Sequence, residues 1–229
     1  MSNIQGKFPN TRLRRNRMKE FSRRLVAENN LSTDDLILPL FVCEGNNVED
    51  PIKSMPGVSR YSIDKLLNKV EEAVRFSIPA IAIFPQIEPS LKNAEGSLAY
   101  DENNLVCRSI KNIKKEFSGI GIICDVALDP FTDHGHDGLV INDKIDNDKT
   151  LDILEKQALV QVHAGCDVIA PSDMMDGRVG RIRTVLDSNN FQDTLILSYA
   201  AKYASGFYGP FRDAIGSGSK LGKDGKLTY

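Results

Sequence analysis

Short apolar runs that alternate with amphipathic segments constrain the fold of this chain more than any other feature. Each run is long enough for one buried β-strand and is bounded by charged residues, glycine or proline. We expect strands at residues 37–42, 79–85, 120–128, 167–171 and 194–201. Strands that alternate with helices form parallel sheets with right-handed crossovers, so the pattern predicts an α/β fold.

Amphipathic helices are expected between these strands. Ser62 can cap a helix that begins at Ile63 and keeps its apolar residues on one face. Thr150 can cap a second helix over residues 151–164. Two further helices are expected at residues 103–117 and 181–186.

The composition excludes several classes of function. The chain has 229 residues, of which 41% are hydrophobic, so it can bury one substantial core. A formal net charge of −2 gives no basis for binding nucleic acid or an anionic membrane. The first ten residues are polar and no apolar run reaches the roughly 18 residues of a membrane span, so we predict neither a signal peptide nor a span. Four cysteines without paired spacing favour free thiols in a reducing cytoplasm: Cys43, Cys107, Cys124 and Cys166.

Lys202 is the first candidate for chemistry. It follows the apolar run at 194–201, and an apolar strand end can desolvate an ammonium group, lower its pKa and make the amine nucleophilic. Such a lysine can form a Schiff base with a carbonyl substrate. Arg212, ten positions later in an aromatic-flanked loop, is a candidate anion-binding residue. A solvated lysine and a surface arginine are the alternatives.

Polar residues also follow two other predicted strands. Four aspartates and two histidines follow or end the run at 120–128: Asp125, Asp129, Asp133, Asp137, His134 and His136. The strand at 167–171 leads into Ser172, Asp173 and Arg178. Because the carboxyl ends of parallel strands meet at one edge of a sheet, these residues predict one shared site in an α/β barrel.

In these blocks the sequence resembles the porphobilinogen synthase family, also called δ-aminolevulinic acid dehydratase. The matching blocks are residues 38–42, 54–58, 125–138, 170–178 and 198–212, and the resemblance extends from about Pro9 to Tyr229. It implies a TIM (β/α)8 barrel, here its first five β/α units, with an extended N-terminal arm. We expect an arm over residues 1–31 and one catalytic domain over 32–229.

The resemblance implies an activity and the residues that serve it. The family is a lyase that condenses two 5-aminolevulinate molecules to porphobilinogen with loss of two waters, an early step of tetrapyrrole and haem biosynthesis. Lys202 matches the first Schiff-base lysine. Arg212 and Lys226 match residues that bind a substrate carboxylate, and Asp125 and Ser172 match polar residues of the pocket. The segment 204–226 matches the active-site lid.

The family's second catalytic lysine, in a Val-Lys-Pro context, does not occur in this sequence. Lys220, Lys223 and Lys226 lie in a glycine- and serine-rich segment that does not match it. We therefore expect an incomplete copy of a longer protein. A non-catalytic fragment and another Schiff-base barrel lyase or aldolase are the alternatives.

The metal dependence follows from a departure from the zinc-dependent branch. Ala127, Asp129 and Asp137 stand where that branch has three cysteines, so no catalytic zinc is expected. The resemblance to the aspartate-type branch implies an allosteric magnesium ion whose ligand lies beyond Tyr229, and we name no metal ligand here. A solvated acidic loop is the alternative for the aspartates and is favoured for Asp133, while His134 and His136 are expected to form hydrogen bonds that shape the loop.

Assembly is the last expectation. The arm carries apolar residues among its arginines, too many for an idle tail and too few for a core of its own. The family uses this arm to wrap a neighbouring barrel, so the resemblance implies a homo-oligomer built from dimers, an octamer. A flexible arm on a monomer is the alternative.

Overall fold

The computed structural model describes residues 6–203, 205–217 and 226–229. The chain divides into two units, residues 1–35 and 36–229. In the first unit a 3₁₀-helix, Leu13–Arg17, precedes the short helix α1, Glu20–Leu25. Neither element buries a residue, and Leu13 and Leu25 are 85% and 79% exposed.

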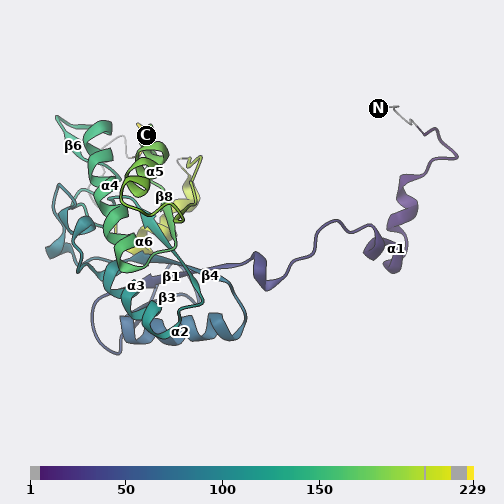
Figure 1. Ribbon diagram of the computed structural model, residues 1–229. Coiled ribbons are helices and arrows are strands. Elements are labelled where there is room, and N and C mark those ends of the chain that lie inside the picture. The colour runs from purple at the N-terminus through teal and green to yellow at the C-terminus, as the bar shows by residue number, and fades with distance from the viewer. Residues whose placement is uncertain (1–5, 204, 218–225) are drawn as a thin grey trace. The chain divides into compact units, whose positions relative to one another are not determined.

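The second unit is built on one seven-stranded sheet in the order β2-β3-β1-β4-β5-β8-β9 (Figure 1). The predicted strands are β1 (Ile37–Val42), β4 (Ala80–Pro85), β5 (Gly121–Val126), β8 (Val168–Pro171) and β9 (Leu195–Ile196). These five run parallel, and β3 (Ser59–Tyr61) pairs with β1 in the same sense. Only β2 (Glu49–Pro51) runs antiparallel to its neighbour among the described strands of this sheet. The α/β fold class is confirmed.

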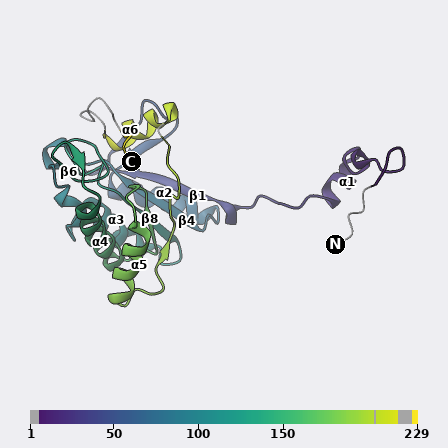
Figure 2. The same ribbon diagram turned by 90° about the horizontal axis from the view of Figure 1, so that it is seen from above.

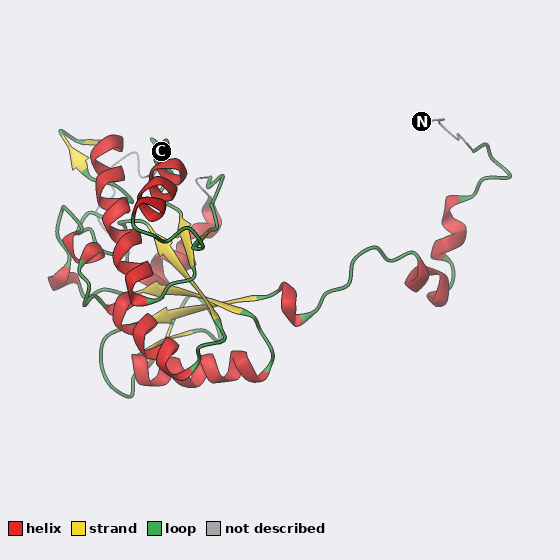
Figure 3. Cartoon of the chain, viewed as in Figure 1, coloured by secondary structure: helices red, strands yellow, loops and turns green. Residues whose placement is uncertain are grey.

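Helices follow the strands as expected. They are α2 (Ile63–Arg75), α3 (Leu105–Glu116), α4 (Asn147–Ala164) and α5 (Arg178–Ser188). Three short 3₁₀-helices, Thr33–Asp35, Pro89–Leu91 and Ser97–Tyr100, lie in the connections. A small hairpin of β6 (Val140–Ile141) and β7 (Lys144–Ile145) lies outside the main sheet (Figure 3).

Alternating side chains of the central strands β1, β4 and β5 form two cores. Leu40, Ile83 and Ile122 pack against the helices on one face of the sheet. Phe41, Phe84 and Ile123 face the other way and pack with α6 (Gly209–Ile215). Figure 2 shows α6 on the opposite side of the sheet from α3, α4 and α5. Because both faces of the sheet are covered, the predicted strands are largely apolar and could be recognised in the sequence. The strands β2 and β3, which carry Asp50 and Arg60, were not predicted.

Several local predictions were wrong. The strand expected at 194–201 is only two residues long, because β9 pairs only through Leu195 and Ile196. Thr150 does not cap α4. Asp146 is the cap, because its carboxylate accepts from the Lys149 N–H. Thr150 lies one turn into the helix, where its hydroxyl donates to the Asp146 carbonyl. Ser62 stands at the start of α2 but its hydroxyl bonds Val48 and Asp64 instead.

Other boundaries also moved. The helix expected at 181–186 is longer, Arg178–Ser188. The part of the lid segment that the structure describes is largely helical, with a 3₁₀-turn at Gly206–Tyr208 that leads into α6. Lys220 and Lys223 lie outside the described residues. All four cysteines are buried free thiols, as expected.

Candidate active site

Polar side chains meet at the carboxyl end of β5 and β8. Asp125 lies near the end of β5, and Ser172 follows directly after β8. Asp125 is in register with Ala170, so the two strands bring Asp125 and Ser172 side by side. The Ser172 hydroxyl donates a hydrogen bond to Asp125 Oδ1. This pair, predicted from two separate blocks, forms one side of the site.

A cluster of two carboxylates and two lysines forms the other side. Asp137 is completely buried, and its Oδ1 atom lies 3.3 Å from Nζ of Lys202. Its Oδ2 atom lies 2.7 Å from Nζ of Lys226. Lys226 also contacts Asp129 Oδ2 at 2.9 Å, and Asp129 is 2% exposed. Asp137 therefore binds the amines of two lysines, both of which are distant from it in the sequence.

Opposite charges in this cluster act on each other's pKa, as Lys226 and Asp129 show. Burial alone would lower the pKa of Lys226, but attraction to Asp129 and Asp137 outweighs it and the pKa is raised. Burial and the neighbouring Asp137 raise the pKa of Asp129, and the charges of Lys226 and Lys202 counteract this. Replacement of Asp137 would remove the ion-pair partner of Lys202, and replacement of Lys226 would remove that of the buried Asp129.

Asp125 differs from the other two aspartates. Burial raises its pKa to about 7, although the Ser172 hydrogen bond and the charge of Lys202 act to lower it. A group with this pKa exchanges its proton readily near neutral pH, as a general acid or base must. Because the charge of Lys202 acts on the pKa of Asp125, these two predicted site residues interact electrostatically.

The aromatic ring of Tyr208 contacts two cations. The guanidinium carbon of Arg212 lies 5.2 Å from the ring centroid, and Nζ of Lys226 lies 5.6 Å from it. Tyr208 ends the 3₁₀-turn that precedes α6, and Arg212 lies within α6. The predicted carboxylate-binding pair, Arg212 and Lys226, is thus gathered around one ring.

The acidic loop is shaped by hydrogen bonds. His134 Nδ1 accepts from the His136 N–H, and the ring of His136 lies 3.0 Å from the Tyr229 hydroxyl. The bonding role expected for both histidines is confirmed, and Asp133 is exposed, as favoured. Asp129 and Asp137 are not part of a solvated loop, so that alternative is wrong for them: both are buried and paired with lysines.

Helix α4 holds the end of β5 from behind. The amide Nε2 of Gln161 donates to the carbonyl of Asp125 at 3.0 Å, and Nε2 of Gln157 donates to the carbonyl of Ala127 at 3.2 Å. Both glutamines are buried. They satisfy carbonyls where the ladder of the sheet ends, so the backbone that carries Asp125 is fixed on both sides.

Sequence reasoning missed the pairing of Asp137 with both lysines and the role of Tyr208. The aspartate block was noticed for metals, and nothing in its spacing indicates a partner 65 or 89 positions away. The signal would have been two lysines and three aspartates that all match the same site, since charges that become partly buried need opposite partners. Tyr208 lies in the matched 198–212 block and carried no separate signal.

The residues at the cysteine positions do not form a metal centre. Ala127 offers no ligating side chain, and Asp129 and Asp137 are paired with lysine ammonium groups. Within the described ranges, no group of three or more His, Cys, Asp or Glu side chains could hold a metal ion. Over the same ranges, no helix is long and apolar enough to cross a membrane.

Comparison with known proteins gives one family. The model of the family described as delta-aminolevulinic acid dehydratase matches residues 10–229. A delta-aminolevulinic acid dehydratase of Bradyrhizobium diazoefficiens is 59% identical over 95% of this chain and 62% of its own length. That of Methanothermus sociabilis is 49% identical over 97% of this chain and 68% of its own length. The chain thus spans about three fifths of the first of these relatives.

A solved structure shows the same fold. The delta-aminolevulinic acid dehydratase of Toxoplasma gondii, crystallised with its reaction product porphobilinogen, superimposes with a TM-score of 0.92 at 44% sequence identity. The match covers 99% of this chain and 63% of that one. This similarity confirms the predicted barrel class for the part of the fold that the chain spans.

Proposed function

The chain belongs to the delta-aminolevulinic acid dehydratase family, and we propose that it carries the Schiff-base lysine and a carboxylate clamp of a porphobilinogen synthase. The activity is a lyase reaction that condenses two 5-aminolevulinate molecules to porphobilinogen with loss of two waters. The observation that carries this proposal is the buried carboxylate of Asp137 between the amines of Lys202 and Lys226.

The geometry supports imine formation at Lys202. The ammonium must lose a proton before its nitrogen attacks the ketone, and Asp137 Oδ1 lies 3.3 Å away as the acceptor. Attack of the neutral amine forms the carbon–nitrogen bond, and one amine proton passes to the ketone oxygen to give a carbinolamine. The second amine proton then passes to the same oxygen, the carbon–oxygen bond breaks, and water leaves as the imine forms. Asp125, with a pKa of about 7, is suited to transfer these protons.

The clamp fits the other end of an amino-keto acid. Arg212 and Lys226 gather around Tyr208, where a guanidinium and an ammonium group can hold one carboxylate. In this structure Lys226 is neutralised by Asp129 and Asp137. A substrate carboxylate would pair with Lys226 in place of one of these aspartates. The amino group of the substrate could then pair with the aspartate that is released.

Metal, assembly and location are part of the same proposal. We propose an allosteric magnesium ion, for which we name no ligand in this chain, and no catalytic zinc at Ala127, Asp129 and Asp137. Homo-oligomers, octamers built from dimers, are supported by apolar residues exposed on the arm: Phe8, Leu13, Met18, Phe21 and Leu25. A cytoplasmic location is supported by four unpaired, buried thiols.

Reductive trapping tests the central claim. The chain is incubated with 5-aminolevulinate and borohydride, and the labelled peptide is mapped by mass spectrometry. We expect one label, at Lys202, and none in Lys202→Arg, whose guanidinium keeps the charge but is no amine nucleophile.

Lys114 is a matched control for this experiment. Its side chain is 23% exposed, against 21% for Lys202, and it also pairs with one aspartate, Asp167 at 2.7 Å. Lys114→Arg should leave the labelling unchanged. Equal labelling of Lys114 and Lys202 in the unmodified chain would show unselective amine chemistry and would overturn the proposal.

A further inference from the structure

The last turn of α6 is held by side chains that are distant in sequence. The helix ends at Ile215, Gly216 follows in the left-handed region at φ 63°, and the Ser217 N–H bonds back to the Arg212 carbonyl at 3.0 Å. Such an ending leaves several carbonyls directed away from the helix. Three of these carbonyls and one carboxylate are bound from the rim of the sheet.

Arg60, in β3, binds two of the three carbonyls. Its Nε donates to the Ala214 carbonyl at 2.7 Å, and its Nη2 donates to the Asp213 carbonyl. Its Nη1 pairs with Asp50 of β2, which fixes the plane of the guanidinium. The side chain is only 14% exposed. A cation at the carbonyl end of a helix is favoured by both the hydrogen bonds and the helix dipole.

Ser54 and Lys92 bind the same turn. The hydroxyl and the backbone N–H of Ser54 both donate to Asp213 Oδ2. Lys92 Nζ donates to the Gly216 carbonyl at 2.9 Å. Ser54 opens the 54–58 block, which carries part of the family resemblance and which the proposed chemistry does not use.

Apolar packing seats the inner side of the helix. Ala214 and Ile215 are buried against the inner face of the sheet, and the Phe211 ring lies edge-on to Phe84 with centroids 5.2 Å apart. This is the face on which Figure 2 shows α6. The hydrogen bonds from Arg60, Ser54 and Lys92 then fix the orientation of α6 on this face, which apolar packing alone does not determine.

We propose that Arg60, Ser54 and Lys92 form a latch that fixes the last turn of α6 to the rim of the sheet and thereby positions Arg212. Arg212 directly precedes Asp213, whose carbonyl and carboxylate are both bound by the latch. Arg60 is in this sense a positioning residue, because it acts on Arg212 through the helix. The consequence for substrate rests on the proposed function, whereas the latch itself does not.

Hydrogen exchange measures the latch without substrate. In the full chain, Arg60→Met keeps much of the side-chain bulk but removes every donor. We expect the amides of residues 212–217 to exchange at least tenfold faster, because hydrogen bonds made by charged groups are among the stronger ones. Ser54→Ala and Lys92→Met remove fewer bonds and should each give a smaller increase at the same amides.

Arg183 is the matched control. It also donates to two backbone carbonyls, those of Thr194 and Phe191, but in the loop between α5 and β9. Arg183→Met should leave exchange at 212–217 unchanged. Unchanged exchange in Arg60→Met, or an equal increase in Arg183→Met, would overturn the latch. If Arg60→Met does not fold, Ser54→Ala and Lys92→Met decide by the same criterion.

A second measurement separates the latch from the proposed function. Arg60→Met should raise the 5-aminolevulinate concentration for half-maximal trapping at Lys202 at least fivefold, with little change in the trapping rate at saturation. Arg60→Lys should restore part of the loss. Absence of trapping in the unmodified chain refutes the proposed function and leaves the exchange test standing. Normal trapping concentrations with fast exchange would refute the positioning of Arg212.

Discussion

Nζ of Lys202 lies 3.3 Å from Oδ1 of Asp137, a carboxylate without accessible surface. This one contact joins the loop after β9 to the acidic loop after β5. It places a proton acceptor beside the amine that the proposed reaction makes nucleophilic. Because the second oxygen of Asp137 binds Lys226, any change at this carboxylate acts on both lysines.

Replacement of Asp137 should therefore be costly. Asp137→Asn keeps the size of the side chain but leaves two partly buried ammonium groups with Asp129 alone. We expect the free energy of unfolding, measured with urea, to fall by about 3 kcal/mol, the usual cost of breaking a buried ion pair. Trapping at Lys202 should also slow, since the proton acceptor is lost.

The exposed pair of Asp152 and Arg181 provides the comparison. Asp152 is 60% exposed, and water and salt screen its contact with Arg181. Asp152→Asn should change stability far less than Asp137→Asn. Similar losses in both variants would mean that the cluster around Asp137 adds nothing beyond a surface charge.

Five strands of the sheet were predictable because most of their residues are buried, whereas the short polar strands β2 and β3 were missed. Runs such as that of β5 are apolar except for Asp125 near the carboxyl end and can be recognised without tertiary information. The β6–β7 hairpin was missed, although Asn142 and Asp143 both adopt positive φ and are typical of its tight turn. The prediction of the cap of α4 failed because two residues that can cap a helix, Asp146 and Thr150, lie close together in the sequence.

The sequence predicted which residues belong to the candidate site, but not how their side chains pair. Lys202, Arg212 and Asp125 follow from strand ends and from the resemblance, and these sequence signals are local. The link from Asp137 to Lys202 and Lys226 depends on how three loops meet above the sheet, and no local pattern encodes that. The latch of Arg60 on α6 is hidden for the same reason, since its partners lie more than 150 positions away.

Stability should depend on pH through Asp125. Its pKa is raised from 3.8 to about 7 by burial, so the folded state holds a proton that the unfolded state releases. The stabilising contribution of the protonated form is complete below about pH 4 and is lost as pH rises towards about 7. Between these values Asp125 lowers the free energy of unfolding by at most about 1.4 kcal/mol per pH unit.

Urea unfolding at pH 5, 6, 7 and 8 measures this effect. Asp125→Asn should flatten the fall, because its amide does not titrate, and Asp133→Asn is the control because Asp133 is exposed. Asp173, whose pKa burial raises to about 6, acts in the same direction and remains in both variants. An unchanged pH slope in Asp125→Asn would contradict the assignment.

Chelators that remove zinc should not affect trapping at Lys202. Ala127 has no ligating atom, and Asp129 and Asp137 already neutralise lysines at 2.7–3.3 Å. Elemental analysis of the purified chain should show less than one zinc per chain. One tightly held zinc whose removal abolishes trapping would make the proposed metal dependence wrong.

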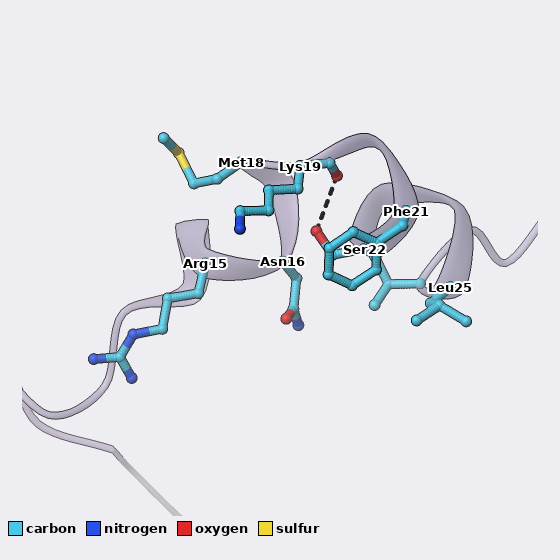
Figure 4. A pocket seen from close by; sticks show the side chains of 8 residues that line it. Arg15, Asn16, Met18, Lys19, Phe21, Ser22 and Leu25 are labelled. Carbon is cyan, nitrogen blue, oxygen red and sulfur yellow. Dashed lines mark hydrogen bonds between the residues drawn. The ribbon is translucent and has the colours of Figure 1, made fainter.

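Assembly should depend on apolar residues of the arm. Figure 4 shows Phe21 and Leu25 of α1 beside a hollow that Met18 and Arg15 also line. Phe21 is 61% exposed and Leu25 79%, a large apolar area for contact with a second copy. Light scattering should give a mass above that of the monomer for the unmodified chain and a smaller one for Phe21→Asp with Leu25→Asp. Asn30→Asp adds charge to the same arm at an already polar position and should leave the mass unchanged. A monomer mass for all three proteins would refute the role of the arm in assembly.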